Sequence, residues 1–216
     1  MKSTYFVDIT GFSRPGVASE PVRYTLEPAD KSISKNDLQF EEYCRYVDSA
    51  MSKNGYLKAD STDDANVAVY FYYGIGNPKE HQYSFSLPTL AQTGVSLPVR
   101  EDTLTHTAVE EAGTAAPRHE ITRYQQLQEN NATYYRYLAL SAIDLQKYKD
   151  DGQIVELWRM EASSAGSSSD LRVVVPILVA ASAKYIGKDT GRAISIVVKD
   201  DDPEVTEIRS HNLIEY

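Results

Sequence analysis

The side chains in this sequence best suited to catalysis or metal binding are its four histidines, His81, His106, His119 and His211. Three of them lie between residues 77 and 131, a segment with little hydrophobic periodicity. Glu110 lies four residues after His106, and Glu120 directly follows His119, so each pair could supply metal ligands. The chain has no HExxH motif, however, and no pair of ligands at metal-binding spacing on a predicted helix. The sequence therefore predicts solvated loop histidines and no metal site.

Motifs for nucleophilic catalysis and for phosphate or calcium binding are also missing from the sequence. There is no GxSxG elbow, and the single cysteine, Cys44, lies in a helical pattern typical of a buried residue. Gly74-Ile75-Gly76 follows a predicted strand, but it lacks the third glycine of a phosphate loop. The acidic runs 60–64 and 200–202 lack the ligand spacing of an EF-hand. We therefore predict no catalytic residue and no cofactor, which favours a non-enzymatic protein.

Tyrosine is unusually frequent, with 16 residues against five phenylalanines and one tryptophan. A tyrosine ring offers a broad apolar face and a hydroxyl group, so a row of exposed rings suits stacking on sugars. Four tyrosines fall on faces predicted to be buried: Tyr43, Tyr73, Tyr135 and Tyr137. Tyr70, Tyr72 and Tyr134 fall on the opposite face and form the candidate ligand-binding or partner-binding strip.

Length and charge limit the classes of protein to which the chain can belong. A domain of 216 residues can bury roughly 70% of its unfolded surface, so it needs neither disulfides nor a structural metal. A net charge of -9 and a pI near 5.0 argue against nucleic acid or an anionic membrane as the partner. No run approaches the ~20 apolar residues of a membrane-spanning helix, and no signal peptide is visible at residues 1–6. The chain is thus either cytoplasmic or begins behind a removed leader.

The spacing of apolar residues predicts an α+β fold. A helix is expected over 37–54, where Phe40, Cys44, Val47 and Met51 recur at helical spacing. A second helix is expected over 170–186, capped by Asp170 and containing an awkward Pro176. Strands are expected over 4–10, 21–26, 67–75, 133–145, 154–162, 193–199 and 205–208. Two helices packed on one face of a mostly antiparallel sheet give a two-layer sandwich. We predict a single domain over 1–216, with 77–131 as a long irregular excursion containing Pro and Gly.

A hairpin is predicted to join the strands at 133–145 and 154–162. If Asp151-Gly152 is a two-residue hairpin loop, Leu145 lies opposite Trp158 and Ile143 lies opposite Met160. This register gathers the bulkiest side chains on one face, which is then expected to be the buried one. Asp144, a carboxylate among apolar neighbours, is expected to cap or hydrogen-bond locally near the turn.

Several segments resemble the DUF4136 type of bacterial envelope lipoprotein. They are TYYRYLALSAID at 133–144, LWRMEA at 157–162, FEEY at 40–43, the pair Gly55-Tyr56 and ANVAVY at 65–70. The likeness covers about residues 20–200 apart from the excursion, and its motifs are packing motifs. It implies a secreted precursor with a lipidated N-terminal cysteine and a small α+β domain in the periplasm or anchored at the outer membrane. This chain has no N-terminal cysteine, so the lipid anchor would belong to a removed part.

Together, these features favour a non-enzymatic cell-envelope protein with an interaction or structural role. Its expected partner is a protein or a glycan of the envelope, and its oligomeric state is left open. One alternative is a hydrolase or ligand-binding enzyme that uses His81, His106 or His119 in the excursion. Another is a glycan-binding protein that uses the tyrosine-rich sheet face.

Overall fold

The computed structural model describes the backbone of residues 3–16, 22–77, 79–93 and 118–210, and the side chains of the same residues outside 79–131. The chain divides into two compact units, Met1–Lys79 with Ala132–Tyr216, and Glu80–Asn131. In the second unit, β5 (Lys79–Thr93) pairs with β6 (Arg118–Asp144), so the predicted excursion contains strands of its own. The side chains of all four histidines, and hence the histidine-based hydrolase alternative, lie outside the described residues.

The first unit is built on a mixed sheet in the order β3-β2-β4-β6-β7-β1-β8. Besides β6, its strands are β1 (Thr4–Ser13), β2 (Arg23–Pro28), β3 (Leu57–Lys58), β4 (Val67–Ile75), β7 (Glu156–Gly166) and β8 (Ile194–Lys199). β2 pairs in parallel with β3 and β4, and the other described neighbours in this order are antiparallel. The predicted α+β class with a mostly antiparallel sheet is confirmed.

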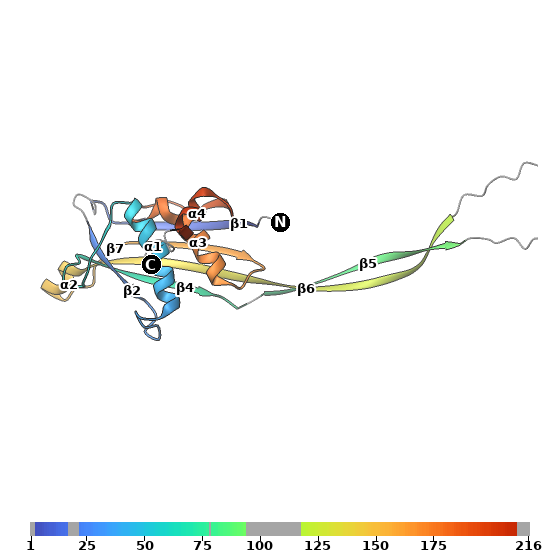
Figure 1. The fold of residues 1–216 in the computed structure, drawn as a ribbon, viewed down its shortest axis with the longest axis horizontal. Helices are drawn as coiled ribbons and strands as arrows, with labels where there is room; N and C mark the ends of the chain where they lie inside the picture. The colour runs from blue at the N-terminus through green and yellow to red at the C-terminus, as the bar shows by residue number, and fades with distance from the viewer. Residues whose placement is uncertain (1–2, 17–21, 78, 94–117, 211–216) are drawn as a thin grey trace, which may run out of the picture. The chain divides into compact units, whose positions relative to one another are not determined.

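The helices α1 (Leu38–Lys53), α3 (Leu171–Ser182) and α4 (Pro203–Ser210) pack against one another on one face of this sheet (Figure 1). Asp37 caps α1 by accepting hydrogen bonds from the N–H groups of Gln39 and Phe40. Asp170 caps α3 in the same way, and Pro176 lies inside that helix. The main core lies between the helices and the sheet and includes Val7, Ile9, Val69, Phe71, Leu138, Leu140, Trp158, Met160, Ile177 and Leu178.

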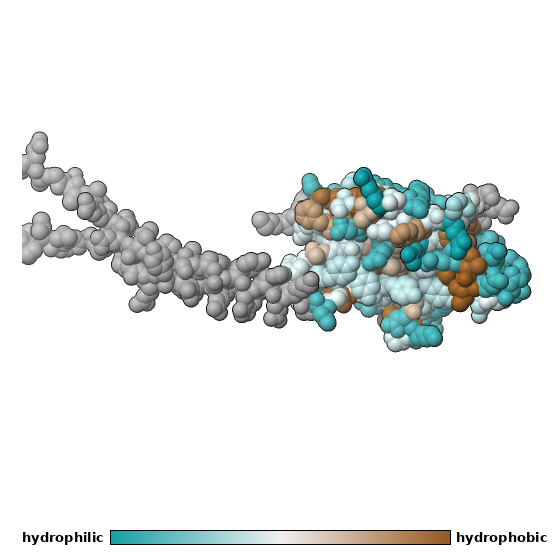
Figure 2. Space-filling model, turned by 180° about the vertical axis from the view of Figure 1, so that it is seen from behind, coloured by the Kyte–Doolittle hydropathy of each residue, from teal (hydrophilic) through white to brown (hydrophobic). Residues whose placement is uncertain are grey.

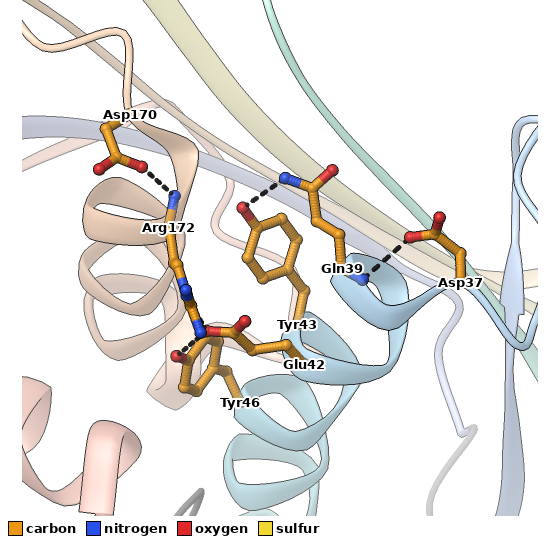
Figure 3. Close-up of polar contacts among 7 residues, drawn as sticks. All are labelled: Asp37, Gln39, Glu42, Tyr43, Tyr46, Asp170 and Arg172. Atoms are coloured by element: carbon orange, nitrogen blue, oxygen red, sulfur yellow. Dashed lines mark hydrogen bonds and ion pairs between the residues drawn. The ribbon is translucent and has the colours of Figure 1, made fainter.

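Polar contacts join α1 to α3 at the rim of this helical layer (Figure 3). Nε of Arg172 lies 2.8 Å from Oε1 of Glu42, and the same oxygen accepts a hydrogen bond from the Tyr46 hydroxyl at 3.0 Å. One helical turn earlier, Nε2 of Gln39 donates to the Tyr43 hydroxyl at 3.0 Å. Of these contacts, the Arg172–Glu42 pair joins α3 to α1, whereas the two tyrosine hydrogen bonds lie within α1.

The predicted hairpin after β6 is wrong, because the connection is a short helix, α2 (Leu145–Asp151). Asp144 caps it by accepting from the N–H of Lys147 at 3.0 Å, which confirms the local role expected for this carboxylate. Gly152 ends it with a φ of 67°, so the Asp151-Gly152 signal marks a helix C-cap. The observed register pairs Ala142, not Leu145, with Trp158.

This three-residue change reverses the two faces of β6, because side chains alternate along a strand. The side chains of Arg136, Leu138, Leu140 and Ala142 face the helices and are at most 1% exposed. The predicted burial of Tyr135 is therefore wrong: this side chain lies on the opposite face and is 46% exposed.

The last predicted strand, 205–208, is also wrong, because these residues lie in α4. Pro203 occupies the first position of the helix, where proline is well tolerated. Val205 and Ile208 are three residues apart, and both are buried, which is the spacing of one helix face. Because these residues form a helix and not a strand, β8 is an end strand of the sheet in the described part of the chain.

Candidate functional site

The sheet face opposite the helices carries a group of exposed aromatic side chains. Strand alternation places on it Phe6 and Phe12 of β1, Tyr70 and Tyr72 of β4, and Tyr135 of β6, all of which are exposed. Their strand neighbours, such as Val7 and Phe71, point to the other side and are buried under the helices. The exposed face is therefore an aromatic surface built on regular strands, and we call it the open face.

The structure places two of the three predicted site residues on the open face. Tyr70 is 39% exposed and Tyr72 is 47% exposed. Tyr134 is two residues from Arg136 in β6 and therefore lies on the same face of the strand, which is the helix side of the sheet. It is not part of this surface. Tyr135 and Tyr137 take its place, with ring centroids 6.3 Å apart. The misplacement of Tyr134 follows directly from the wrong register of the predicted hairpin.

The open face contains a hollow of ≈240 Å³ between Tyr72 on β4 and Phe12 on β1. The hollow exists because β6 places small side chains between these rings. Ala139 is paired with Tyr72, and Ser141, the next residue of β6 on the same face, is paired with Tyr70. Its described lining is Thr10, Phe12, Tyr72, Ala139, Leu140, Ser141, Glu156, Arg159, Met160 and Glu161. Sequence analysis misses Phe12 because the predicted first strand ends at Thr10, whereas β1 runs to Ser13.

Charged groups surround the aromatic rings of this hollow. The Ser141 hydroxyl donates to Oε1 of Glu156 at 2.8 Å, and Nη1 of Arg159 lies 3.9 Å from Oε2 of the same residue. The Arg159 guanidinium also lies over the ring of Phe12, with Cζ 4.7 Å from the centroid. Glu161 is exposed, and its carboxylate makes no hydrogen bond or ion pair with another described residue. The hollow therefore combines two aromatic walls with carboxylate and guanidinium groups that reach solvent.

The groups whose pKa is perturbed lie away from the hollow, on the helix side of the sheet. Burial raises the pKa of the Cys44 thiol to about 12, which leaves it protonated and unreactive at neutral pH. Burial also raises the pKa of Tyr24, Tyr43 and Tyr56, and raises that of Tyr73 to about 12. The described residues contain no cluster of three or more His, Cys, Asp or Glu side chains able to hold a metal. These perturbations reflect packing and supply no activated nucleophile.

The raised tyrosine pKa values predict that stability falls in alkaline solution. An unfolded tyrosine loses its proton near pH 10, whereas these four buried or partly buried tyrosines hold theirs to higher pH in the folded state. The unfolded state then binds fewer protons, so the free energy of unfolding is highest below about pH 10 and declines above it. We expect a loss of roughly 1 kcal/mol or more between pH 9 and 11.5, measured by urea unfolding with absorbance at 295 nm to follow tyrosinate. A Tyr73→Phe variant should show a shallower decline, and constant stability up to pH 11.5 would contradict the prediction.

No family model and no curated protein matches the chain. Among solved structures, the chain is similar to a PDZ domain protein from Parabacteroides distasonis, with 10% sequence identity and a TM-score of 0.42. The match covers 91% of this chain and 39% of that chain. At this TM-score the likeness carries no argument about function. Among the described helices, none is both long and apolar enough to cross a membrane.

Proposed function

We propose that this protein is a non-enzymatic binding protein of the bacterial cell envelope and that its open face binds a glycan. The observation that carries the proposal is the hollow between Tyr72 and Phe12, with Arg159 and Glu161 at its rim. A sugar ring has apolar C–H faces that pack on aromatic rings, and hydroxyl groups that hydrogen-bond to carboxylates and guanidinium groups. The hollow offers both kinds of partner within one site.

The distribution of apolar groups favours a sugar over a flat protein surface. Figure 2 views the molecule from the side opposite to Figure 1, and its brown apolar surface forms separate patches between pale and teal side chains. A protein interface of ordinary strength needs a larger continuous patch with few charges at its centre. The hollow of ≈240 Å³ is smaller than the ~300–1,000 Å³ of pockets for drug-sized ligands. It therefore suits one ring of an oligosaccharide, with neighbouring rings on Tyr70 or the Tyr135–Tyr137 pair.

The same groups favour binding over cleavage of the glycan. Glycoside hydrolysis needs one carboxyl group kept protonated in apolar surroundings and a second carboxylate on the other side of the scissile bond. Glu156 instead accepts a hydrogen bond from Ser141 and has a side chain that is 41% exposed. The described residues that line the hollow all belong to the sheet strands β1, β4, β6 and β7, so no described helix or loop contributes to its walls. A hydrolase that uses histidines in 77–131 stays a separate prediction.

The envelope location is part of the proposal, and its support is the resemblance of residues 40–70 and 133–162 to envelope lipoproteins. An envelope polysaccharide, such as the cell-wall glycan, is then the expected ligand. Fractionation of the source cells tests the location, because the proposal expects the protein in periplasmic or outer-membrane fractions and a purely cytoplasmic pool would contradict it.

Substituting the hollow's side chains should weaken glycan binding. We expect Tyr72→Ala and Arg159→Ala each to weaken binding by about tenfold or more, since each removes an aromatic or charged contact worth about 1–2 kcal/mol. Binding is measured by calorimetry with soluble cell-wall oligosaccharides and by co-sedimentation with purified sacculi. Tyr148→Ala is the matched control, because Tyr148 is an equally exposed tyrosine on α2, away from the open face.

The outcomes separate a binding surface from a structural role. Tyr72→Phe should retain most of the affinity because the stacking ring is kept, whereas Tyr72→Ala should not. Circular dichroism confirms that each variant is folded before binding is compared. Absence of binding by the unaltered protein to every glycan tested, or equal binding by Tyr72→Ala and Tyr148→Ala, would overturn the proposal.

A further inference from the structure

The end strand β8 has backbone hydrogen-bonding groups that face away from the sheet. The Asp200 N–H donates to the Ser3 carbonyl at 3.0 Å, which fixes which residues of β8 are hydrogen-bonded to β1. In an antiparallel pair such residues alternate, so Val198, Ile196 and Ile194 also present their backbone groups to β1. Ser195, Val197 and Lys199 must then present theirs to the outer edge.

Two of these three residues keep their edge groups without a partner in the described chain. The Lys199 N–H donates to Oδ2 of Asp202, and its carbonyl accepts from the Asp202 N–H, so this end of the edge is closed by a turn. The N–H and C=O groups of Ser195 and Val197 have no such contact. An extended chain laid beside β8 could therefore form up to four backbone hydrogen bonds with these two residues.

A hollow of ≈490 Å³ runs along this edge. It is lined by the three consecutive residues Ile196, Val197 and Val198. Side chains alternate between the faces of a strand, so three consecutive residues line one hollow only where it reaches the strand's edge. Its other walls come from α1, α3, η1 (Ala183–Tyr185) and α4, through Lys53, Asn54, Ala180, Ala181, Ala183, Lys184, Lys188, Asp202, Glu204 and Ile208. Small and aliphatic side chains make up much of this lining, so an apolar side chain fits there.

The rim of this hollow carries charges of both signs, with Lys184 and Lys188 from the segment before β8 and Asp202 and Glu204 from the segment after it. Lys53 is paired with Glu207 at 2.6 Å. Lys184 lies over the ring of Tyr185, and Nζ of Lys188 donates to the Lys184 carbonyl, so neither lysine contacts a carboxylate of the described residues. The two ammonium groups before β8 favour an anionic group at that end of an added chain, whereas Asp202 and Glu204 disfavour one at the other end.

We propose that β8 accepts an extended peptide of a partner protein as an added strand, with a carboxylate at the end that lies near Lys184 and Lys188, independently of the glycan site. The peptide's backbone pairs with Ser195 and Val197, an apolar side chain enters the hollow beside Ile196 and Val198, and a carboxylate lies near Lys184 and Lys188. The carboxylate comes from an acidic side chain or from the peptide's C-terminus. This is recognition by strand addition, in which backbone hydrogen bonds give affinity and the hollow and charges give selectivity.

The test begins with selection of random octapeptides displayed on phage against the full chain. We expect enrichment of sequences that combine alternating apolar residues with acidic ones. An enriched peptide, made with a free and with an amidated C-terminus, then serves as the fluorescent probe. Equal binding of both forms assigns the carboxylate to a side chain, and loss on amidation assigns it to the C-terminus.

Two variants test the edge and the charges separately. Val197→Pro removes the outward N–H and should weaken probe binding at least about tenfold, whereas Val197→Thr keeps the N–H and should bind like the unaltered protein. Reversing both charges in a Lys184→Glu, Lys188→Glu variant should weaken binding by a similar factor, with Lys147→Glu on α2 as the charge control. Amide hydrogen exchange of ¹⁵N-labelled protein, followed by NMR, provides a readout without mutation. The bound probe should slow the exchange of the Ser195 and Val197 amides.

Three results would overturn this inference. The first is failure of selection to enrich any peptide over Val197→Pro used as bait. The second is a probe that binds without changing the exchange of Ser195 and Val197. The third is sedimentation showing a dimer that Val197→Pro converts to a monomer, because a second copy of the chain would then occupy the edge.

Discussion

Replacing Trp158 by alanine is expected to lower the free energy of unfolding by about 3–5 kcal/mol. Trp158 is the single tryptophan of the chain and is 2% exposed, on the helix side of β7. Its indole packs edge-on against Tyr56, with ring centroids 5.9 Å apart, and lies near Gly187, which has a φ of +72° and no side chain to obstruct the rings. Removing the indole leaves a large cavity that this rigid surrounding, with two adjoining strands and a glycine turn, cannot fill by relaxation.

Chemical denaturation followed by far-ultraviolet circular dichroism measures this loss, because the variant has no tryptophan fluorescence. Trp158→Phe is the matched control and should lose clearly less, since it keeps an aromatic ring against Tyr56. A loss below about 1.5 kcal/mol for the alanine variant would mean that the Trp158 cavity collapses, contrary to the packing described above.

The elements that the sequence predicts correctly are those whose local signals agree with their tertiary environment. For α1, the regular apolar spacing predicts a helix over 37–54, and the structure has it over Leu38–Lys53. For β4, the apolar run over 67–75 predicts a central strand, and it pairs with β2 on one side and β6 on the other. No long-range information is needed in either case.

The errors arise where one local signal has two physical meanings. An Asp-Gly pair after an apolar run suits a two-residue hairpin turn, and its glycine equally suits the left-handed residue that ends a helix. Gly152 has the second role, so α2 replaces the hairpin and the faces of β6 are exchanged. Only the register with β7, a contact between distant residues, decides between the two.

The candidate site follows the same pattern. Tyr70 and Tyr72 could be assigned to the exposed face because β4 alternates regularly, and their position is predicted from the sequence. Tyr135, Phe12 and Arg159 come together only through the register of β6, β7 and β1, which the sequence does not reveal. The hollow itself depends on Ala139 and Ser141, small residues whose importance appears only once larger side chains are placed on either side.

The opposite sides of the sheet also differ in how their polar groups are satisfied. On the open face, charged groups reach solvent, so their cost is small and they remain available to a ligand. On the helix side, Arg136 is 1% exposed and no carboxylate of the described residues pairs with it. Its guanidinium donates to the Ser168 carbonyl at 2.9 Å and to the Ser164 hydroxyl at 3.0 Å, while Nε has no partner. Burial lowers the pKa of Arg136, although an arginine stays protonated at neutral pH.

Arg136→Met is therefore expected to match or exceed the stability of the unaltered protein, while Arg136→Ala should lose about 2–4 kcal/mol. The Arg136 side chain lies close against Gly166, since a Cβ added to this glycine would be 2.9 Å from Nη2 of Arg136. Methionine keeps an unbranched apolar side chain in this space and removes the buried charge. Both substitutions take the guanidinium donors from the Ser164 hydroxyl and the Ser168 carbonyl, but alanine also opens a cavity, and the cavity accounts for the difference between them. Urea unfolding of both variants at pH 7 measures the difference. A loss above about 2 kcal/mol for Arg136→Met would contradict this prediction, because it would show that the two guanidinium hydrogen bonds outweigh the cost of burying the charge.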